Sequence, residues 1–501
     1  MSALGEAIAR RQPAVSLRAT SPLHGLRRGS LGTVDLVAQS VAAAAPAGVL
    51  LTQAGLAEGL GTWAYATLVV AAGVVMLVAG SASVFARRIA AAGGVYTFVT
   101  RGLGPILGFV AGAAIAAGYA GMSIDTLHSG ARRIARLLQP GDPASAAPPG
   151  SGPSTDPGMV ALVTVVAVAV IVLVIVVGAR ATTRVLLVIE IAAVSGILAL
   201  SLVVFATTGW NLGQLVPDLD DVPSVGAFAA GLGLALMSFV GFESGAALGP
   251  EARRPLASVP RALVWTGAAL ALVYLFGAAA EVSASASGAT GRTSGLQGSA
   301  VALAPWLGTV VEVVVAASWI ACTLACTNAL VRLVLTMARE GVLPAWLGRT
   351  SHRFGTPHVA AVAVGVLIGA GTLIESATGR GAMFDATAAL ASGLGFVIAY
   401  LLLSAAAVAY LMGIGEFTLR EAWPAMLGVG ILGAIALAET LTLSGVDLAA
   451  LGVLIVVVGA ATAIHVVRLR RGAVVAASTG VYDTPVARDA LATSGERQGR
   501  S

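Results

Sequence analysis

Glu243 is the side chain in this sequence whose type and surroundings most clearly suggest chemistry. It stands in a long apolar segment, two residues after Gly241. A charged side chain at the middle of a bilayer costs roughly 2.5–3.5 kcal/mol on insertion scales, so a residue of this kind indicates a function or a partner. Two roles are open. The carboxyl group either couples its protonation to the geometry of the surrounding helix, or makes a structural hydrogen bond that holds an irregular backbone.

Glu190 is a second carboxyl group within an apolar segment, six residues after Arg184. We treat it as a second candidate for proton coupling. The alternative is an ion pair with an arginine near one mouth of the protein.

The sequence contains no constellation typical of a catalytic or metal site. All 29 basic residues are arginine, which excludes the lysine of a P-loop ATPase and that of a Schiff-base enzyme. Cys322 and Cys326 are four residues apart, where Cβ atoms on a helix are about 5–6 Å apart, and a disulfide needs about 3.8 Å. The histidines are scattered, at positions 24, 128, 352, 358 and 465. We therefore expect no metal, no cofactor and no enzymatic activity, with a membrane-embedded enzyme as the less favoured alternative.

The composition indicates the element that must position these carboxyl groups, which is a membrane-spanning helix. Hydrophobic residues make up 57% of the chain and charged residues 11%, against about 25% charged in average globular chains. Twelve apolar segments reach the roughly 20 residues that cross a bilayer, and they lack the alternation of strands. The predicted spans are 32–54, 62–84, 104–127, 158–178, 184–208, 225–248, 261–281, 305–336, 357–375, 383–411, 423–443 and 446–466.

Two of these spans carry residues that interrupt a helix. The first contains Ala45-Pro46-Ala47-Gly48 and the sixth contains Phe239-Val240-Gly241-Phe242. Proline has no N–H to donate, and glycine adopts backbone angles that other residues avoid. Paired interruptions at equivalent places in two halves point to the binding site of a secondary transporter. The alternative is that glycine and proline are simply common in membrane helices.

An interrupted pair of helices offers partners to both ends of a zwitterion. Free N–H groups near Ala47 and Gly48 suit a carboxylate, and free carbonyl groups from Phe239 to Gly241 suit an ammonium group. An amino acid satisfies both. We expect further contacts from Tyr119 on the third span and from Cys326 and Asn328 on the eighth, although packing and helix-to-helix hydrogen bonds are the alternative for these three.

The distribution of arginine predicts the orientation. With the N-terminus inside, 24 of the 29 arginines fall on the cytoplasmic side, as the positive-inside rule requires. We expect a cytoplasmic tail over 1–29 without a cleavable signal peptide, a core of ten helices over 30–412, two further helices over 413–466 and a polar, disordered cytoplasmic tail over 467–501. Loops at 138–157, 209–224 and 283–300 should lie outside the membrane. The arginines stand beside spans, so the net charge of +5 does not indicate nucleic-acid binding.

Three motifs in register resemble one known family. Gly93-Gly94-Val95-Tyr96 with Arg101-Gly102-Leu103-Gly104-Pro105 is similar to its loop between helices 2 and 3. The segment 239–244, with Glu251, Pro255 and Pro260 after it, resembles its helix 6 signature, and 339–344 with 354–357 resembles the join of helices 8 and 9. On these motifs, residues 30–465 resemble amino acid permeases of the amino acid–polyamine–organocation (APC) superfamily.

The resemblance implies an all-α membrane protein of twelve helices: a 5+5 inverted repeat with broken helices 1 and 6, plus two peripheral helices. It also implies a secondary active transporter that moves an amino acid or related amine by alternating access, coupled to protons or to exchange. Its place would be a bacterial cytoplasmic membrane. Ala45-Pro46-Ala47 departs from the Gly-Ser-Gly of many relatives, and Met237 replaces a gating aromatic residue. A sensor or a channel on the same fold remains the alternative.

Overall fold

The computed structural model describes residues 21–52, 56, 59–139, 155–208, 212–220, 222–286, 295–379, 382–474 and 478–483. Within these ranges the chain is helical and forms no strand, and its one β-bridge joins Leu31 to Ala252. Eleven of the described helices are long and apolar enough to cross a membrane. The prediction of an all-α membrane protein is therefore confirmed.

The helices follow the predicted spans closely, apart from the sixth. In chain order the long helices are α2 (Thr33–Ala43) with α3 (Pro46–Thr52), α5 (Trp63–Ala86), α6 (Val95–Leu138), α7 (Pro157–Val177), α8 (Ala179–Thr208), α10 (Pro255–Ala286), α12 (Pro305–Arg339), α13 (His358–Thr378), α14 (Met383–Gly413), α15 (Leu419–Thr442) and α16 (Gly445–Arg470). The sixth span is the short α9 (Val225–Met237), followed by the 3₁₀ helix η2 (Ser244–Glu251). Shorter elements are η1 (Leu212–Leu215), α11 (Gly295–Leu303) and η4 (Ala345–Gly348).

The longest helix, α6, is kinked where the sequence predicts the start of the third span. It has 44 residues, and Gly104 within it has φ 85°. Pro105 follows, and its ring and missing N–H prevent a regular helix at this point. A straight helix of this length would measure about 66 Å, twice the hydrocarbon core of a bilayer. The kink therefore separates a short segment, 95–103, from the part that spans the membrane.

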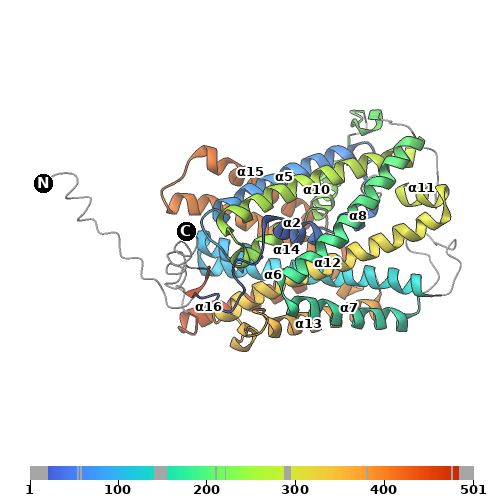
Figure 1. Ribbon diagram of the computed structural model, residues 1–501. Coiled ribbons are helices and arrows are strands. Elements are labelled where there is room, and N and C mark those ends of the chain that lie inside the picture. Colours follow the sequence, from blue (N-terminus) through green and yellow to red (C-terminus); the bar gives the residue numbers. More distant parts are fainter. Residues whose placement is uncertain are drawn as a thin grey trace, which may run out of the picture.

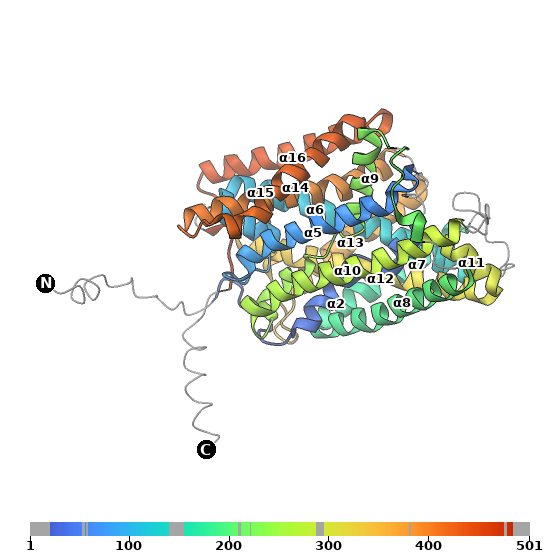
Figure 2. The ribbon, with the colours of Figure 1, turned by 90° about the horizontal axis from the view of Figure 1, so that it is seen from above.

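The broken helices lie inside the bundle and two complete helices lie at its margin. Helix α6 packs against both α12 and α14, and α2 packs on α8, α10 and α12. In Figure 2, α15 and α16 lie along one edge of the bundle and α8 along the opposite edge. Only Ala450 and His465 of α16 are buried. The peripheral position expected for the last two helices thus agrees with their packing.

Both ends of the described chain meet at one end of the bundle, which we call the terminal face (residues 21–31 and 478–483; Figure 1). The Ser21 hydroxyl donates to Asp483 Oδ1 at 2.6 Å, and Arg28 forms an ion pair with the same carboxylate. The prediction of a disordered tail from 467 is wrong for these residues. Helix α16 continues to Arg470, and 478–483 fold back onto the bundle.

The three loops predicted from the sequence agree with the structure to different extents. Of 138–157, residues 140–154 lie outside the described residues. In 209–224 the chain forms η1, and the carbonyl of Asp218 accepts from Trp63 Nε1 at 2.9 Å. The prediction of a loop over 283–300 is wrong at both ends, because α10 extends to Ala286 and α11 begins at Gly295. The intervening 287–294 lie outside the described part of the chain.

Candidate functional site

The first membrane helix is interrupted where the sequence places Pro46. Helix α2 ends at Ala43 and α3 begins at Pro46. Between them Ala45 has φ 44°, the one positive φ outside glycine in the described chain. Left-handed backbone costs a non-glycine residue about 1–2 kcal/mol, so the break is held by the surrounding structure. The break predicted in the first span is confirmed.

Protein groups occupy the carbonyl oxygens that this break leaves free. The Ala43 carbonyl accepts from Cys322 Sγ at 3.1 Å, with Cys326 Sγ at 3.8 Å. The Ala44 carbonyl accepts from the Tyr274 hydroxyl at 2.8 Å. The two thiols are free and 3.9 Å apart, as the sequence predicts. Backbone carbonyls at membrane depth need such partners, so Cys326 does lie at the break.

Gly48, in the first turn of α3, lies directly against an aromatic ring. A Cβ atom built on Gly48 would be 2.6 Å from Cε2 of Trp319. Ala45 and Ala47 beside it are fully buried. The residues expected to hold a carboxylate therefore lie under Trp319, a residue of α12 that the sequence did not single out.

The second break directly contacts the first. Helix α9 ends at Met237, and the chain turns irregularly until η2 begins at Ser244. Gly241 in this turn has φ 93°, and a Cβ atom there would lie 2.7 Å from the Cβ of Ala43. Only glycine combines this backbone angle with so close an approach. The break predicted around Gly241 is confirmed, and the two breaks form one junction.

Aromatic side chains pack around the second break. The rings of Phe239 and Tyr274 are 5.0 Å apart between centroids and nearly perpendicular. Phe242 lies 5.7 Å from the ring of Tyr400. Both phenylalanines and Val240 are buried. These buried apolar side chains hold the turn.

Glu243 lies between two tyrosine hydroxyl groups next to this junction. Tyr119 of α6 donates to Oε1 at 2.6 Å, and Tyr400 of α14 donates to Oε2. The Gly241 N–H donates in turn to the Tyr400 oxygen at 3.4 Å. Glu243 is 3% exposed, and no cation pairs with it in the described residues. The carboxyl group thus connects the broken helix to α6 and α14.

Toward the terminal face, α2 is fastened to η2. The Gly245 N–H donates to Ser40 Oγ at 2.9 Å, and the Ser244 hydroxyl donates to the Gln39 carbonyl at 3.3 Å. The Gln39 side-chain amide donates to the Ala325 carbonyl of α12 at 2.7 Å. A single polar turn of α2, at Gln39 and Ser40, therefore joins both η2 and α12.

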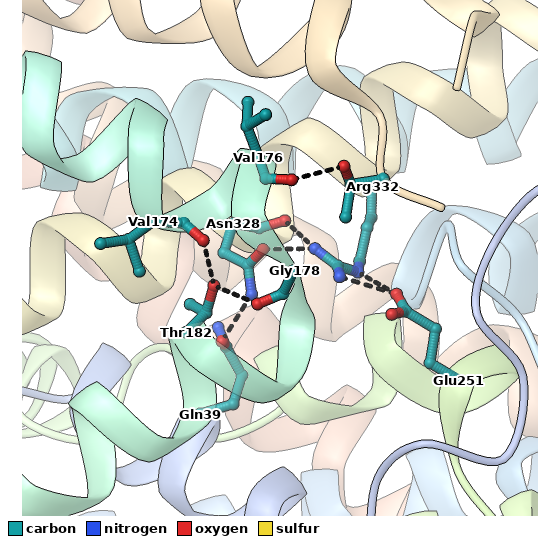
Figure 3. Close-up of polar contacts among 9 residues, drawn as sticks. Gln39, Val174, Val176, Gly178, Thr182, Glu251, Asn328 and Arg332 are labelled. Carbon is teal, nitrogen blue, oxygen red and sulfur yellow. Dashed lines mark hydrogen bonds and ion pairs between the residues drawn. The ribbon is translucent and has the colours of Figure 1, made fainter. Parts of the chain in front are cut away.

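A buried chain of charged and amide groups continues from Gln39 (Figure 3). Asn328 Nδ2 donates to Gln39 Oε1 at 2.8 Å. Arg332 donates to Asn328 Oδ1 and pairs with Glu251, its Nη2 2.7 Å from Oε1. Arg332 and Glu251 are 1% and 2% exposed. Asn328 accordingly makes a helix-to-helix contact on the terminal side and does not line the junction's open side.

Glu340 follows α12 at the terminal face, outside the membrane-spanning part. It accepts from the hydroxyl of Tyr96 and from the N–H of Val481 at 2.7 Å. Burial raises the pKa of this carboxyl from its ordinary value of 4.5 to about 7. The folded tail is held further by Arg101, whose Nε donates to the Gly480 carbonyl at 2.9 Å. Three segments distant in sequence, the start of α6, the end of α12 and the folded tail, therefore meet at Glu340.

A cavity of about 260 Å³ approaches the junction from the opposite side. It lies between α3, α6, α9, α12 and α14 and is lined by Val49, Leu56, Met122, Asp125, Thr126, Leu234, Ala235, Met237, Ser238, Trp319 and Ser392. Between Glu243 and the terminal face, the space bordered by Gly93, Gly94 and Leu333 is about 10 Å³. The cavity therefore leads toward the junction from one side and is separated from Gly48 by Trp319, whereas the space on the other side is small.

Glu190 lies away from this cavity. It is 3% exposed on α8, where Oε1 accepts from the Ser318 hydroxyl at 3.3 Å. Its Oε2 has no hydrogen-bond partner. The alternative of an ion pair with an arginine is wrong, because no described arginine pairs with Glu190.

The structure brings most of the predicted residues together, and it adds others. Ala45, Pro46, Gly241 and Cys326 meet at one junction, and Tyr119 reaches it through Glu243. Residues that the sequence analysis missed are Gln39, Tyr274, Trp319 and Tyr400. Each is a polar or amphipathic side chain in an apolar span, which was an available signal, although nothing in the sequence shows which partner each one meets.

Comparison with known proteins agrees with this geometry. A model of the family described as amino acid permease matches residues 31–444. Transporters of uncharacterized function from Mycobacterium bovis and Mycobacterium tuberculosis are 28% identical over 421 residues, which cover 84% of this chain and 88% of theirs. The branched-chain amino acid permease BcaP of Lactococcus lactis is 27% identical over 315 residues, covering 56% of this chain and 65% of that protein.

Proposed function

The chain belongs to the amino acid permease family, and from this premise we propose that it is a secondary active transporter of an amino acid or a related amine. Family membership and eleven apolar helices make it a multi-pass membrane transporter. The observation that carries the finer proposal is the cavity of about 260 Å³ whose lining includes residues next to both of the touching helix breaks. A small zwitterion entering from the open side would meet backbone groups of both.

The substrate would bind where the cavity reaches the two half-helices. Its lining includes Val49 in the first turn of α3 and Ser238 at the end of α9. We propose that the N–H groups of Ala47 and Gly48 receive the carboxylate, and that carbonyl groups between Phe239 and Gly241 receive the ammonium group. Trp319 covers Gly48 in this structure, so binding would require the indole to move aside.

Alternating access would follow from the arrangement of the breaks. We propose that α2 to α8 and α9 to α14 are two inverted halves, each beginning with an interrupted helix, with α15 and α16 peripheral. The terminal face would be cytoplasmic, since most arginines fall on that side. The described conformation would then be open outward and closed inward, in a bacterial cytoplasmic membrane.

Glu243 would couple the substrate site to the closed side. It contacts α6 and α14 through Tyr119 and Tyr400, both of which donate to it. Gain or loss of its proton would change how those hydroxyl groups bond and so change the turn at Gly241. Uptake by Glu243→Gln should lose its dependence on pH. A variant that kept the full pH dependence would overturn this role.

Concentrative uptake of a labelled amino acid into proteoliposomes tests the function. An imposed proton gradient, or a counter-substrate inside, should drive accumulation above the outside concentration. Flux that only equalises the two concentrations would support a channel instead, and binding without flux would support a sensor. Thermal-shift screening against amino acids and polyamines would identify the substrate. A turned-over product would support the enzyme alternative.

A further inference from the structure

A second hollow opens on the flank of the bundle, separate from the cavity at the junction. Helices α2, α8 and α10 border a groove of about 610 Å³. Val34, Ile191 and Trp265 line it and are 62%, 58% and 67% exposed. Large apolar side chains exposed on a membrane-spanning helix face lipid. The groove is therefore open sideways to the bilayer.

In the described part of the chain, one arginine and one carboxyl oxygen in this groove have no protein partner. Arg261 lines it and makes no ion pair or hydrogen bond in the described part of the chain. Glu190 also lines it and is buried, with Oε2 unbonded. Buried polar atoms in proteins nearly always have partners. An unpartnered buried carboxyl oxygen facing a groove indicates a ligand that supplies the missing bond.

The two groups lie at different depths. Both α8 and α10 begin at the terminal face, where Arg180 binds the Ser30 carbonyl at 2.6 Å. Arg261 is six residues into α10 and Glu190 is eleven into α8, so at 1.5 Å per residue they lie about 9 Å and about 16 Å along their helices. A ligand that meets both has an acidic group near the membrane surface and a hydrogen-bond acceptor deeper in the bilayer.

We propose that this groove is a binding site for one phospholipid with a net negative headgroup. Its phosphate pairs with Arg261, a glycerol ester carbonyl accepts from the carboxyl group of Glu190, and an acyl chain lies along Val41 and Ala269. Glu190 has no cation beside it, so the neutral acid, which donates a hydrogen bond, is the form that burial favours.

Charge selects an anionic lipid over a zwitterionic one. Glu190 is the one acidic residue in the lining, and it lies deep. Asp35, near the mouth, is already engaged: Oδ1 accepts from the Thr183 hydroxyl at 3.0 Å and Oδ2 from the Gly32 N–H at 2.8 Å. Arg184 and Arg254 are exposed at the same ends of α8 and α10. Basic residues near the surface attract anionic lipid, and no free carboxylate is left for a headgroup ammonium.

Native mass spectrometry of the whole purified chain tests this, with phosphatidylglycerol and phosphatidylcholine as the added lipids. The wild type should retain one phosphatidylglycerol more tightly than phosphatidylcholine. Arg261→Gln should weaken its retention about fivefold, as expected for one arginine near the surface. Arg420→Gln, an exposed arginine at the start of α15, is the matched control and should not change it.

Three further variants locate the lipid. Ala269→Trp fills the groove from an exposed position and should remove the bound lipid. Glu190→Gln keeps a donor and should retain it, whereas Glu190→Leu should not. If the wild type retained the two lipids equally, the bound lipid would be general annular lipid and the proposal would be overturned. The same holds if Arg261→Gln and Arg420→Gln retained phosphatidylglycerol equally. Retention by Ala269→Trp would overturn the location. None of these readouts depends on amino acid transport.

Discussion

The two sides of the junction differ in how their polar groups are used. On the terminal side, Gln39, Asn328, Arg332 and Glu251 form a continuous buried chain that ties α2 to α12 and η2. On the opposite side the same helices border a cavity of about 260 Å³. There, the hydroxyl groups of Thr126 and Thr323 are 2.9 Å apart between α6 and α12, and Arg133 pairs with Glu312 at 2.8 Å across the same two helices.

This difference indicates which side of the junction stabilises the described conformation. Buried polar groups are stabilising only when every partner is present, so the terminal side behaves as a unit that is either complete or broken. On the opposite side, moving α6 away from α12 would break the Thr126–Thr323 contact and the partly exposed pair of Arg133 with Glu312. Mutations should therefore destabilise the protein mainly on the terminal side, and should impair binding mainly on the opposite side.

The largest loss of stability is expected for Arg332→Met, on the terminal side. Glu251 would remain buried without its cation, and removing one partner of a buried pair costs about 3–5 kcal/mol. Thermal unfolding of the purified protein should show this loss. The double variant with Glu251→Met should recover most of it, because both charges are then gone.

The matched control is the pair at the edge of the terminal face, Arg88 with Glu416. Their side chains are 25% and 58% exposed, and pairs of this kind contribute at most about 1 kcal/mol. If Arg88→Met were as damaging as Arg332→Met, the buried chain would not be what holds the terminal side.

We expect the stability of the protein to change with pH through the protonation of Glu340. Its pKa of about 7 in the folded protein lies above its ordinary 4.5, so between these values the folded state binds more protons than the unfolded state. Stability should therefore fall as pH rises from 4.5 to 7, by about 3 kcal/mol in all, and stay level above that. Glu340→Gln should flatten this slope in thermal unfolding.

Glu416→Gln serves as the control, because this carboxyl group is exposed on the same face. It should leave the slope as in the wild type. A slope that survives in Glu340→Gln would mean that another group titrates at the terminal face.

Gly241→Ala should damage the contact between the two breaks. The positive φ and the approach to Ala43 together should lower the free energy of unfolding by about 2–3 kcal/mol. Gly459→Ala in α16, where nothing lies within 4 Å, should be neutral or stabilising by up to about 1 kcal/mol. Equal effects would show that the junction tolerates a side chain.

The smallest effect on stability is expected on the open side. Ser238 lines the cavity, and Ser238→Leu should change the free energy of unfolding by less than about 1 kcal/mol. Substrate affinity, measured by thermal shift, should nonetheless be lost because the side chain fills the space. Ser195→Leu, on α8 outside the cavity, should keep that affinity. A destabilised Ser238→Leu would contradict the difference between the two sides.

Much of the architecture was predictable because membrane helices follow local rules. Apolar segments of spanning length located the helices, and Pro46 and Gly241 located the breaks, since the missing N–H and the positive φ are properties of single residues. The kink at Gly104 and Pro105 likewise coincided with a predicted boundary. The polar tail was wrongly expected to be disordered because composition does not show that Asp483 meets Ser21 and Arg28.

The candidate site was only partly predictable, because it depends on which helix faces which. The sequence by itself determined that the chain spans a membrane, where its two helices break, and that Glu243 lies beside one break. Tertiary structure alone decided that the breaks touch, that Tyr119 and Tyr400 meet at Glu243, and that Glu190 lines the groove on the flank of the bundle instead. The physical reason is that a break or a buried charge is set by one residue and its neighbours in the chain. A hydrogen-bond partner 289 residues away, as Asn328 is from Gln39, is set only when the helices pack.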